Sequence, residues 1–149
     1  AGTGLGIITD QINLTGTNPL AEWAGLKNVE TPFVDMNDAY SPYLRTLARG
    51  VADDLGITVE EGIFAGLLGP NFETPAEVNM LRAMNVSYTG VSTALEVIMA
   101  RALNMNVLGL TLAANPAGAR GTTHKSVLEA AEHYADDFER LVRGILRLL

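Results

Sequence analysis

The chain has 149 residues, no cysteine and a formal net charge of -7. This length suits one domain with a hydrophobic core, and we expect residues 1–149 to form a single domain. The lack of cysteine excludes disulfides and thiolate chemistry, and the acidic balance argues against a nucleic-acid partner, which needs clustered Lys and Arg. No apolar run approaches the roughly 20 residues of a membrane span, so we expect no membrane partner. The lack of cysteine fits a cytoplasmic location, which we expect.

The first part of the chain predicts one strand followed by irregular structure. Residues 5–9 form a short apolar run, which is typical of a buried strand. Residues 13–20 are rich in turn-forming types and predict a loop, and residues 23–33 continue irregularly.

A helix and a second strand are expected next. Ser41 resembles an N-cap followed by a proline, which predicts a helix at residues 42–55 that Gly56 ends. The apolar run at residues 62–68 predicts the second strand.

The remainder of the chain predicts alternating helices and strands. Two of the helices begin with a capping box, in which a threonine and a glutamate three residues later satisfy each other's backbone N–H groups. These boxes are Thr74 with Glu77 and Thr93 with Glu96. The expected helices are 75–84, 94–103 and 123–149, and the expected strands are 86–89 and 106–112.

This alternation predicts an α/β fold with a mixed, largely parallel sheet flanked by helices. In such sheets ligands bind beyond the carboxyl ends of the strands. Three segments follow strand ends here, at residues 69–73, 90–93 and 113–118. We interpret the tyrosines as packing residues: Tyr40, Tyr43, Tyr88 and Tyr134.

The first of these segments, residues 69–73, carries an aromatic and an acidic side chain that a helix start does not require. Phe72 and Glu73 stand between a Gly-Pro turn and the Thr74 capping box. Stabilisation near a helix N-terminus, worth ~0.3–1 kcal/mol, is one explanation of the Glu73 carboxylate. Base recognition is the other, because an aromatic face stacks on a heterocycle and a carboxylate accepts the N1–H and 2-amino groups of a 6-oxopurine. Asn71 has no assigned role.

The other two segments also allow two interpretations each. Asn115 precedes Pro116 and is either a turn residue or an amide that binds a purine and stabilises its negative charge as it leaves. Ser92 either caps a helix or holds an anion together with backbone N–H groups. His124 is either a surface or capping histidine or a contact to a sugar hydroxyl. The chain has only two histidines, which argues against a metal cluster.

Five segments resemble the trimeric purine nucleoside phosphorylase family, and together they cover nearly the whole chain in one register. The most specific is "GPNFETPAE" at residues 69–77. The segments are "TDQINLTGTNPL" (9–20), "FVDMNDAYSPYLR" (33–45), "EGIFAGLLGPNFETPAEVNMLRAM" (61–84), "GVSTALEVIMARALNMNVLGLTLAAN" (90–115) and "HKSVLEAA" (124–131).

The resemblance implies a three-layer phosphorylase-like fold and a pentosyltransferase of purine salvage. In this family inorganic phosphate attacks C1′ of a purine ribonucleoside such as inosine or guanosine, and the free purine and ribose 1-phosphate are released. It also implies a homotrimer, phosphate as co-substrate, and no metal or organic cofactor.

The resemblance also assigns roles to the residues on the base side. Glu73 matches the acid that binds the purine N1–H side, and Asn115 matches the amide that holds O6 and N7 of the leaving base. Phe72 matches the aromatic residue that packs on the base. Ala114 stands where the family usually has Thr, and Gln11 stands where it has His.

On the sugar and phosphate side, Val91 stands where the family usually has Met, whose backbone N–H meets the ribose 2′-hydroxyl. Ser92 matches the serine that contacts phosphate, and His124 the histidine that contacts the 5′-hydroxyl. Phe33 matches the phenylalanine that reaches a neighbouring subunit's sugar site across the trimer interface. Phe64 stands where a Tyr is often found.

The match covers roughly the C-terminal half of the family, without the glycine-rich phosphate loop and the Arg and His that clamp phosphate. A purine-binding fragment and a non-catalytic paralogue are therefore alternatives to an active enzyme. The related methylthioadenosine phosphorylases, which favour 6-aminopurines, generally carry Asp at the position of Asn115. The pair Asn115 and Glu73 favours 6-oxopurines.

Overall fold

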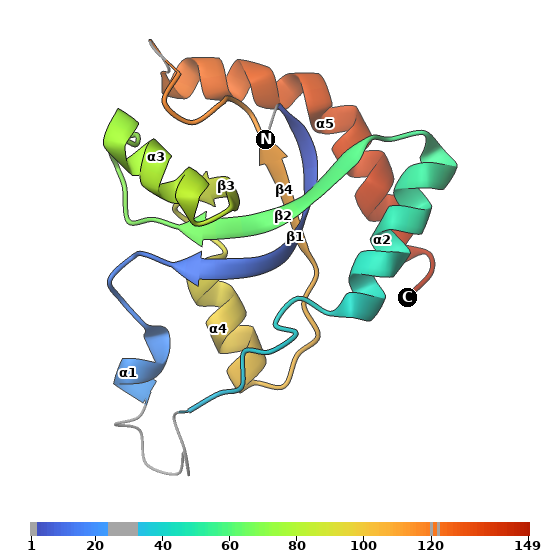
Figure 1. Ribbon diagram of the computed structural model, residues 1–149. Helices are drawn as coiled ribbons and strands as arrows, with labels where there is room; N and C mark the ends of the chain where they lie inside the picture. Colours follow the sequence, from blue (N-terminus) through green and yellow to red (C-terminus); the bar gives the residue numbers. More distant parts are fainter. Residues whose placement is uncertain (1–2, 24–32, 120, 122) are drawn as a thin grey trace.

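In the computed structural model, which describes residues 3–23, 33–119, 121 and 123–149, a four-stranded sheet in the order β3-β2-β1-β4 lies between helices (Figure 1). The strands are β1 (Gly4–Asn13), β2 (Val59–Gly66), β3 (Val86–Gly90) and β4 (Gly109–Ala113). The helices are α1 (Pro19–Trp23), α2 (Pro42–Leu55), α3 (Pro75–Ala83), α4 (Ala94–Ala102) and α5 (His124–Leu146).

The sheet is mixed and largely parallel, as the sequence predicts. Strands β1, β2 and β3 are parallel, and β4 runs antiparallel to β1 with Ala113 opposite Gly4. The parallel pattern predicts that residues 113–118 follow a strand that ends beside β2 and β3. That expectation is wrong, because the carboxyl end of β4 lies at the opposite end of the sheet from those of β2 and β3. The reason is that β4 begins opposite Ile8 in the middle of β1, so α4 does not return the chain to the amino end of the sheet.

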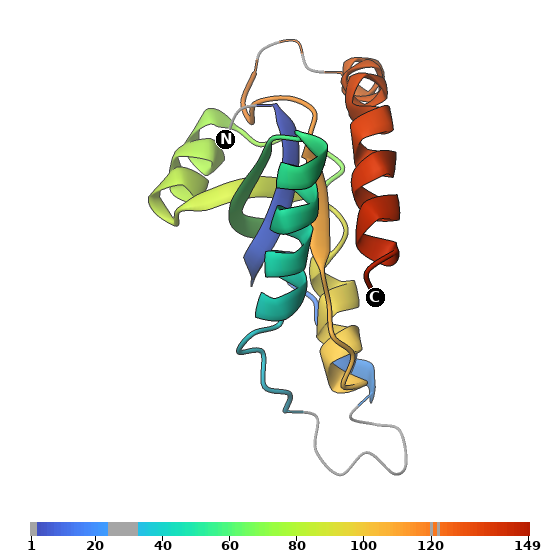
Figure 2. The same cartoon turned by 90° about the vertical axis from the view of Figure 1, so that its right-hand side faces the viewer.

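Helices on both faces of the sheet give the predicted three layers (Figure 2), and a separate hydrophobic core lies on each face. Alternation along β1 sends Leu5 and Ile7 into one core with α2 and α5, and Ile8 into the other with Phe64, Tyr88 and α4. The α2–α5 contact is close, since a Cβ at Gly144 would lie 2.5 Å from Val51 Cγ1. Helices thus cover both faces of the sheet.

Several predicted element ends are confirmed. The Ser41 hydroxyl accepts a hydrogen bond from the Leu44 N–H at 3.4 Å, and Gly56 ends α2 in the left-handed conformation at φ 68°. The Thr74 capping box is present at the start of α3. Among the described residues, no helix is long and apolar enough to cross a membrane.

Other predicted ends are wrong. Part of the expected loop at residues 13–20 is helical, because Asn18 Oδ1 accepts from the Leu20 N–H at 2.9 Å and Pro19 begins α1. Strand β2 begins and ends earlier than the apolar run indicates, and β4 begins later. Of the irregular segment expected at 23–33, Trp23 belongs to α1, and residues 24–32 lie outside the described residues.

Candidate functional site

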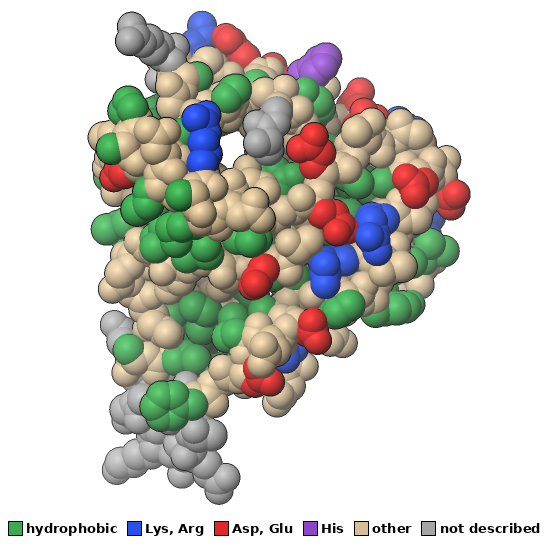
Figure 3. Space-filling model, in the orientation of Figure 1, with side chains coloured by type: hydrophobic (Ala, Val, Ile, Leu, Met, Phe, Trp, Pro, Cys, Tyr) green, Lys and Arg blue, Asp and Glu red, His purple; other side chains and the backbone are tan. Residues whose placement is uncertain are grey.

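A cavity of about 390 Å³ lies between the loop after β2, strand β3 and the segment after β4. Phe72, Glu73, Val91 and Asn115 all line it. The surface is visibly hollowed between α3 and the start of α5 (Figure 3). Pockets of roughly 300–1,000 Å³ are typical of small-molecule sites, so this cavity is large enough for a purine.

The loop after β2 is held in place by the helix that follows it. The Thr74 N–H donates to Glu77 Oε2 at 2.6 Å, and the Glu77 N–H donates to Thr74 Oγ1 at 3.3 Å. The backbone hydrogen bond from Thr74, and then the one from its side chain, lower the pKa of Glu77 below its ordinary value of 4.5. Glu77 therefore serves the cap, whereas Glu73 is half-buried and lines the cavity.

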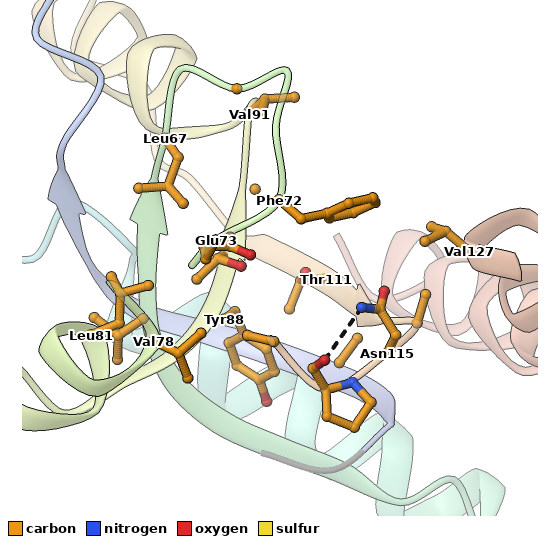
Figure 4. A pocket seen from close by; sticks show the side chains of 18 of the residues that line it. Leu67, Phe72, Glu73, Val78, Leu81, Tyr88, Val91, Thr111, Asn115 and Val127 are labelled. Atoms are coloured by element: carbon orange, nitrogen blue, oxygen red, sulfur yellow. Dashed lines mark hydrogen bonds between the residues drawn. The ribbon is translucent and has the colours of Figure 1, made fainter. Parts of the chain in front are cut away.

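Asn115 reaches this cavity although β4 is antiparallel. Residues 111–117 all line the cavity, so the chain after β4 continues along its wall. The Asn115 amide donates only a long hydrogen bond of 3.4 Å, to the carbonyl of Pro116 (Figure 4). Phe72 and Glu73 thus lie on one side of the cavity and an adaptable amide on the facing side, which suits a planar base with donors and acceptors on its edges.

Tyr88 is a wall residue of this cavity that the sequence analysis interpreted only as packing. It is buried in β3, and its hydroxyl donates to the Glu60 carbonyl at 2.9 Å. Burial, and then the nearby Glu60 and Glu61 charges, raise the pKa of Tyr88, so the phenol stays a neutral donor. Alternation along β3 could not have singled it out, because residues 86–91 all line the cavity.

Ser92, expected to contact phosphate, lines a different hollow of about 500 Å³ together with Thr93 and Glu96. Val91, one residue earlier, lines the candidate base cavity. The turn at the start of α4 therefore presents successive residues to two neighbouring hollows.

The predicted capping box at this helix start is wrong. Thr93 has a φ of 75°, a positive value that β-branched residues rarely adopt, and its side chain makes no capping hydrogen bond. Its hydroxyl lies instead 3.2 Å from the Ser92 hydroxyl. This backbone conformation does not aim the Thr93 oxygen at the first turn of α4, so the Thr-x-x-Glu pattern fails there.

A partly buried hydrogen-bond chain holds the start of α4 against β1. The Gln11 amide donates to the Ala94 carbonyl at 3.0 Å, and the Tyr40 hydroxyl donates to Gln11 Oε1 at 2.7 Å. Burial, and then the charges of Asp10 and Glu96, raise the pKa of Tyr40 well above its ordinary range, so it remains a donor. Gln11, which sequence reasoning recorded only as a departure from the family, thus positions this turn.

The remaining predicted site residues lie outside the base cavity. Phe64 is 3% exposed in the core and packs beneath Gly90, whose Cβ would lie 2.9 Å from Phe64 Cζ. His124 is exposed at the first position of α5, whereas Val127 in the same helix lines the cavity. Phe33 is 89% exposed. Within the described part of the chain, no three His, Cys, Asp or Glu side chains are placed to hold a metal ion.

Comparison with known proteins places these residues in a family. The model of the phosphorylase superfamily matches residues 5–147. The chain is 42% identical over 144 residues to purine nucleoside phosphorylase 1 of Geobacillus stearothermophilus, covering 95% of this chain and 52% of that protein. It is 39% identical over 143 residues to purine nucleoside phosphorylase 1 of Bacillus subtilis, covering 94% and 52%.

Solved structures agree with this match. The fold is similar to Schistosoma purine nucleoside phosphorylase in complex with guanosine, with a TM-score of 0.86, 29% identity, and coverage of 98% of this chain and 56% of that one. Schistosoma purine nucleoside phosphorylase in complex with hypoxanthine gives a TM-score of 0.83, with 29% identity and coverage of 98% and 55%. The chain spans about half the length of the curated relatives it matches.

Proposed function

The chain belongs to the phosphorylase superfamily, and from that premise we propose that it provides the base-binding part of a purine nucleoside phosphorylase. The reaction is phosphate-dependent cleavage of the N-glycosidic bond of inosine- or guanosine-type nucleosides to a free purine and ribose 1-phosphate. The observation that carries this proposal is the meeting of Phe72, Glu73 and Asn115 in one cavity. The names of the relatives and the nucleoside complexes of similar structures support it.

On the base side, the proposed roles follow from chemistry and placement. The Glu73 carboxylate accepts the N1–H of a 6-oxopurine, and the 2-amino group where the base is guanine. The Asn115 amide donates to the purine acceptors N7 and O6, which gain negative charge as the glycosidic bond breaks. Phe72, 52% exposed at the cavity mouth, packs on the face of the bound base.

On the sugar and phosphate side, the proposal uses the start of α4. The Val91 N–H meets the ribose 2′-hydroxyl, and Ser92 contacts phosphate in the hollow of about 500 Å³ that it lines. His124 serves the 5′-hydroxyl, and Phe33 serves a neighbouring subunit in a homotrimer. We further propose a cytoplasmic enzyme of purine salvage that uses phosphate as co-substrate and needs no cofactor.

Calorimetric titration with hypoxanthine and guanine, next to a phosphorolysis assay with inosine and phosphate, tests the function. We expect both bases to bind, adenine to bind more weakly, and base release from inosine to require phosphate. Failure of both bases to bind would contradict the proposal and favour an assembly role.

A purine-binding module is the second candidate. The observation that favours it is the separation of Ser92 from the cavity that contains Glu73 and Asn115. Base binding without phosphate-dependent release of base from inosine would select this module over the enzyme.

A further inference from the structure

A second cavity, of about 290 Å³, adjoins the candidate base cavity. It lies by the start of β1 and the turn between α2 and β2, and Thr58, Glu60 and Tyr134 help to line it. The two cavities share two lining residues, Tyr88 and Ala113. Because the alanine side chain is a single methyl group, the Tyr88 ring forms most of the partition.

Tyr88 is fixed in this position by packing and by a hydrogen bond. A Cβ at Gly6 would lie 2.5 Å from Tyr88 Cζ, so the ring lies across β1 only because that position is glycine. The hydroxyl is anchored on the Glu60 carbonyl, and the side chain is 5% exposed. A buried ring whose hydroxyl end packs against β1 and is hydrogen-bonded to β2 forms a rigid wall.

The ring also lies where a base bound by Glu73 would end. Glu73 and Tyr88 line the same cavity, and Figure 4 shows Tyr88 below Glu73, between Val78 and Asn115. Glu73 in its proposed role binds the edge of the purine that carries N1–H and the 2-amino group. A substituent on that amino group would therefore extend toward the Tyr88 ring.

We propose that Tyr88 determines the size of the base that this site accepts, by closing the cavity against groups attached to the 2-amino position of a guanine. This inference rests on the proposed function, since it concerns how a purine fits. When the ring is removed, the two cavities join, and the space beyond is sufficient for an aryl group, because a cavity of ~150 Å³ holds benzene.

Calorimetric titration with guanine and N2-phenylguanine tests the inference. We expect the wild-type chain to bind guanine at least roughly tenfold more tightly than N2-phenylguanine, and Tyr88→Ala to reduce that ratio by roughly tenfold or more. Tyr88→Phe keeps the ring and removes only the donor to Glu60, so it should keep the wild-type ratio. Tyr134→Ala enlarges the second cavity alone and should also keep it.

Each outcome has a distinct meaning. An equal affinity of the wild-type chain for the two ligands, or an unchanged ratio in Tyr88→Ala, overturns the inference while the proposed function stands. A shift in Tyr88→Phe as large as in Tyr88→Ala overturns it too, since the hydroxyl and not the ring would then control selectivity. No binding of guanine to the wild-type chain overturns the proposed function and this inference together. If Tyr88→Ala does not fold, as judged by circular dichroism, Tyr88→Leu replaces it. The ratio of guanine to N2-phenylguanine affinity in the wild-type chain tests the inference without any variant.

Discussion

Helices α3 and α4 begin with the same Thr-x-x-Glu pattern after a strand, yet their N-termini are built differently. At α3, Thr74 and Glu77 form a complete capping box. At α4, Thr93 has a positive φ and makes no side-chain cap. The start of α4 is held instead by the Gln11 amide on the Ala94 carbonyl.

This difference corresponds to the proposed division of the site. The self-contained cap of α3 fixes the loop that carries Phe72 and Glu73 without using either residue, so both remain available to a ligand. The first turn of α4 leaves Ser92 and the nearby backbone N–H groups without a capping side chain from Thr93, which suits an external anion. The start of α3 is therefore capped by its own residues. The Gln11 amide from β1 only anchors the Ala94 carbonyl of α4, and in our proposal phosphate accepts from the N–H groups there.

The strongest test of the α3 side compares two carboxylates four residues apart. Glu73→Gln should weaken guanine binding by roughly 10- to 100-fold, because a hydrogen bond to a charged group contributes about 1.5–3 kcal/mol. Glu77→Gln should leave guanine binding unchanged, because the Glu77 carboxylate bonds to the Thr74 N–H. Calorimetric titration of both variants measures the contrast, and equal losses in the two would refute the separation of roles.

The facing wall gives the next largest effect. Asn115→Asp should shift preference from hypoxanthine toward adenine by roughly tenfold, because a carboxylate accepts from the 6-amino group but cannot donate to O6. The ratio of the two dissociation constants, measured by calorimetry, reports this shift. An unchanged ratio in a variant that still binds purines would remove Asn115 from base recognition.

These two helix starts also show how far the sequence alone could predict this molecule. The capping box at Thr74 depends on local backbone geometry that Pro75 favours, so the pattern was sufficient there. The same pattern failed at Thr93 because the turn between β3 and α4 imposes a positive φ. Such a constraint is tertiary and leaves no mark on the spacing of Thr93 and Glu96.

Strand β4 shows a second limit. Its existence was predictable from the apolar run, but its direction depends on how α4 crosses the sheet. Asn115 nevertheless lines the same cavity as Glu73. It does so because residues 111–117 run along the cavity wall, and not because β4 ends beside β2 and β3. Tyr88 was missed as a wall residue for a similar reason, since its place over Gly6 appears only when β1 and β3 are assembled.

A smaller effect should separate the two caps in thermal stability. Thr74→Ala should cost about 1 kcal/mol, or roughly 2–4 °C in Tm, because the Glu77 N–H loses its acceptor. Thr93→Ala should change Tm clearly less, because the Thr93 side chain makes no capping bond. Thermal melts followed by circular dichroism measure both, and equal losses would mean that Thr93 caps α4 in solution.

The smallest expected effect is the pH dependence of the α3 cap. The hydrogen bonds from Thr74 lower the pKa of Glu77 from its ordinary value of 4.5, so the carboxylate contributes stability above that value. This contribution is lost as the pH falls through the lower pKa of the folded state. The difference in Tm between the wild-type chain and Glu77→Gln should therefore be constant near neutral pH and shrink below about pH 4.5.

The Thr74→Ala background provides the matched control for this pH effect. The Thr74 side chain is one of the two hydrogen-bonding causes of the lowered pKa, and its backbone N–H is the larger one. The pH-dependent difference in Tm between Thr74→Ala and the double variant with Glu77→Gln should therefore be smaller than the difference between the wild-type chain and Glu77→Gln, but not zero. A pH-dependent difference in Tm of the same size in both backgrounds would mean that the Thr74 side chain does not lower the pKa of Glu77. A difference that grows at low pH would contradict the lowered pKa itself.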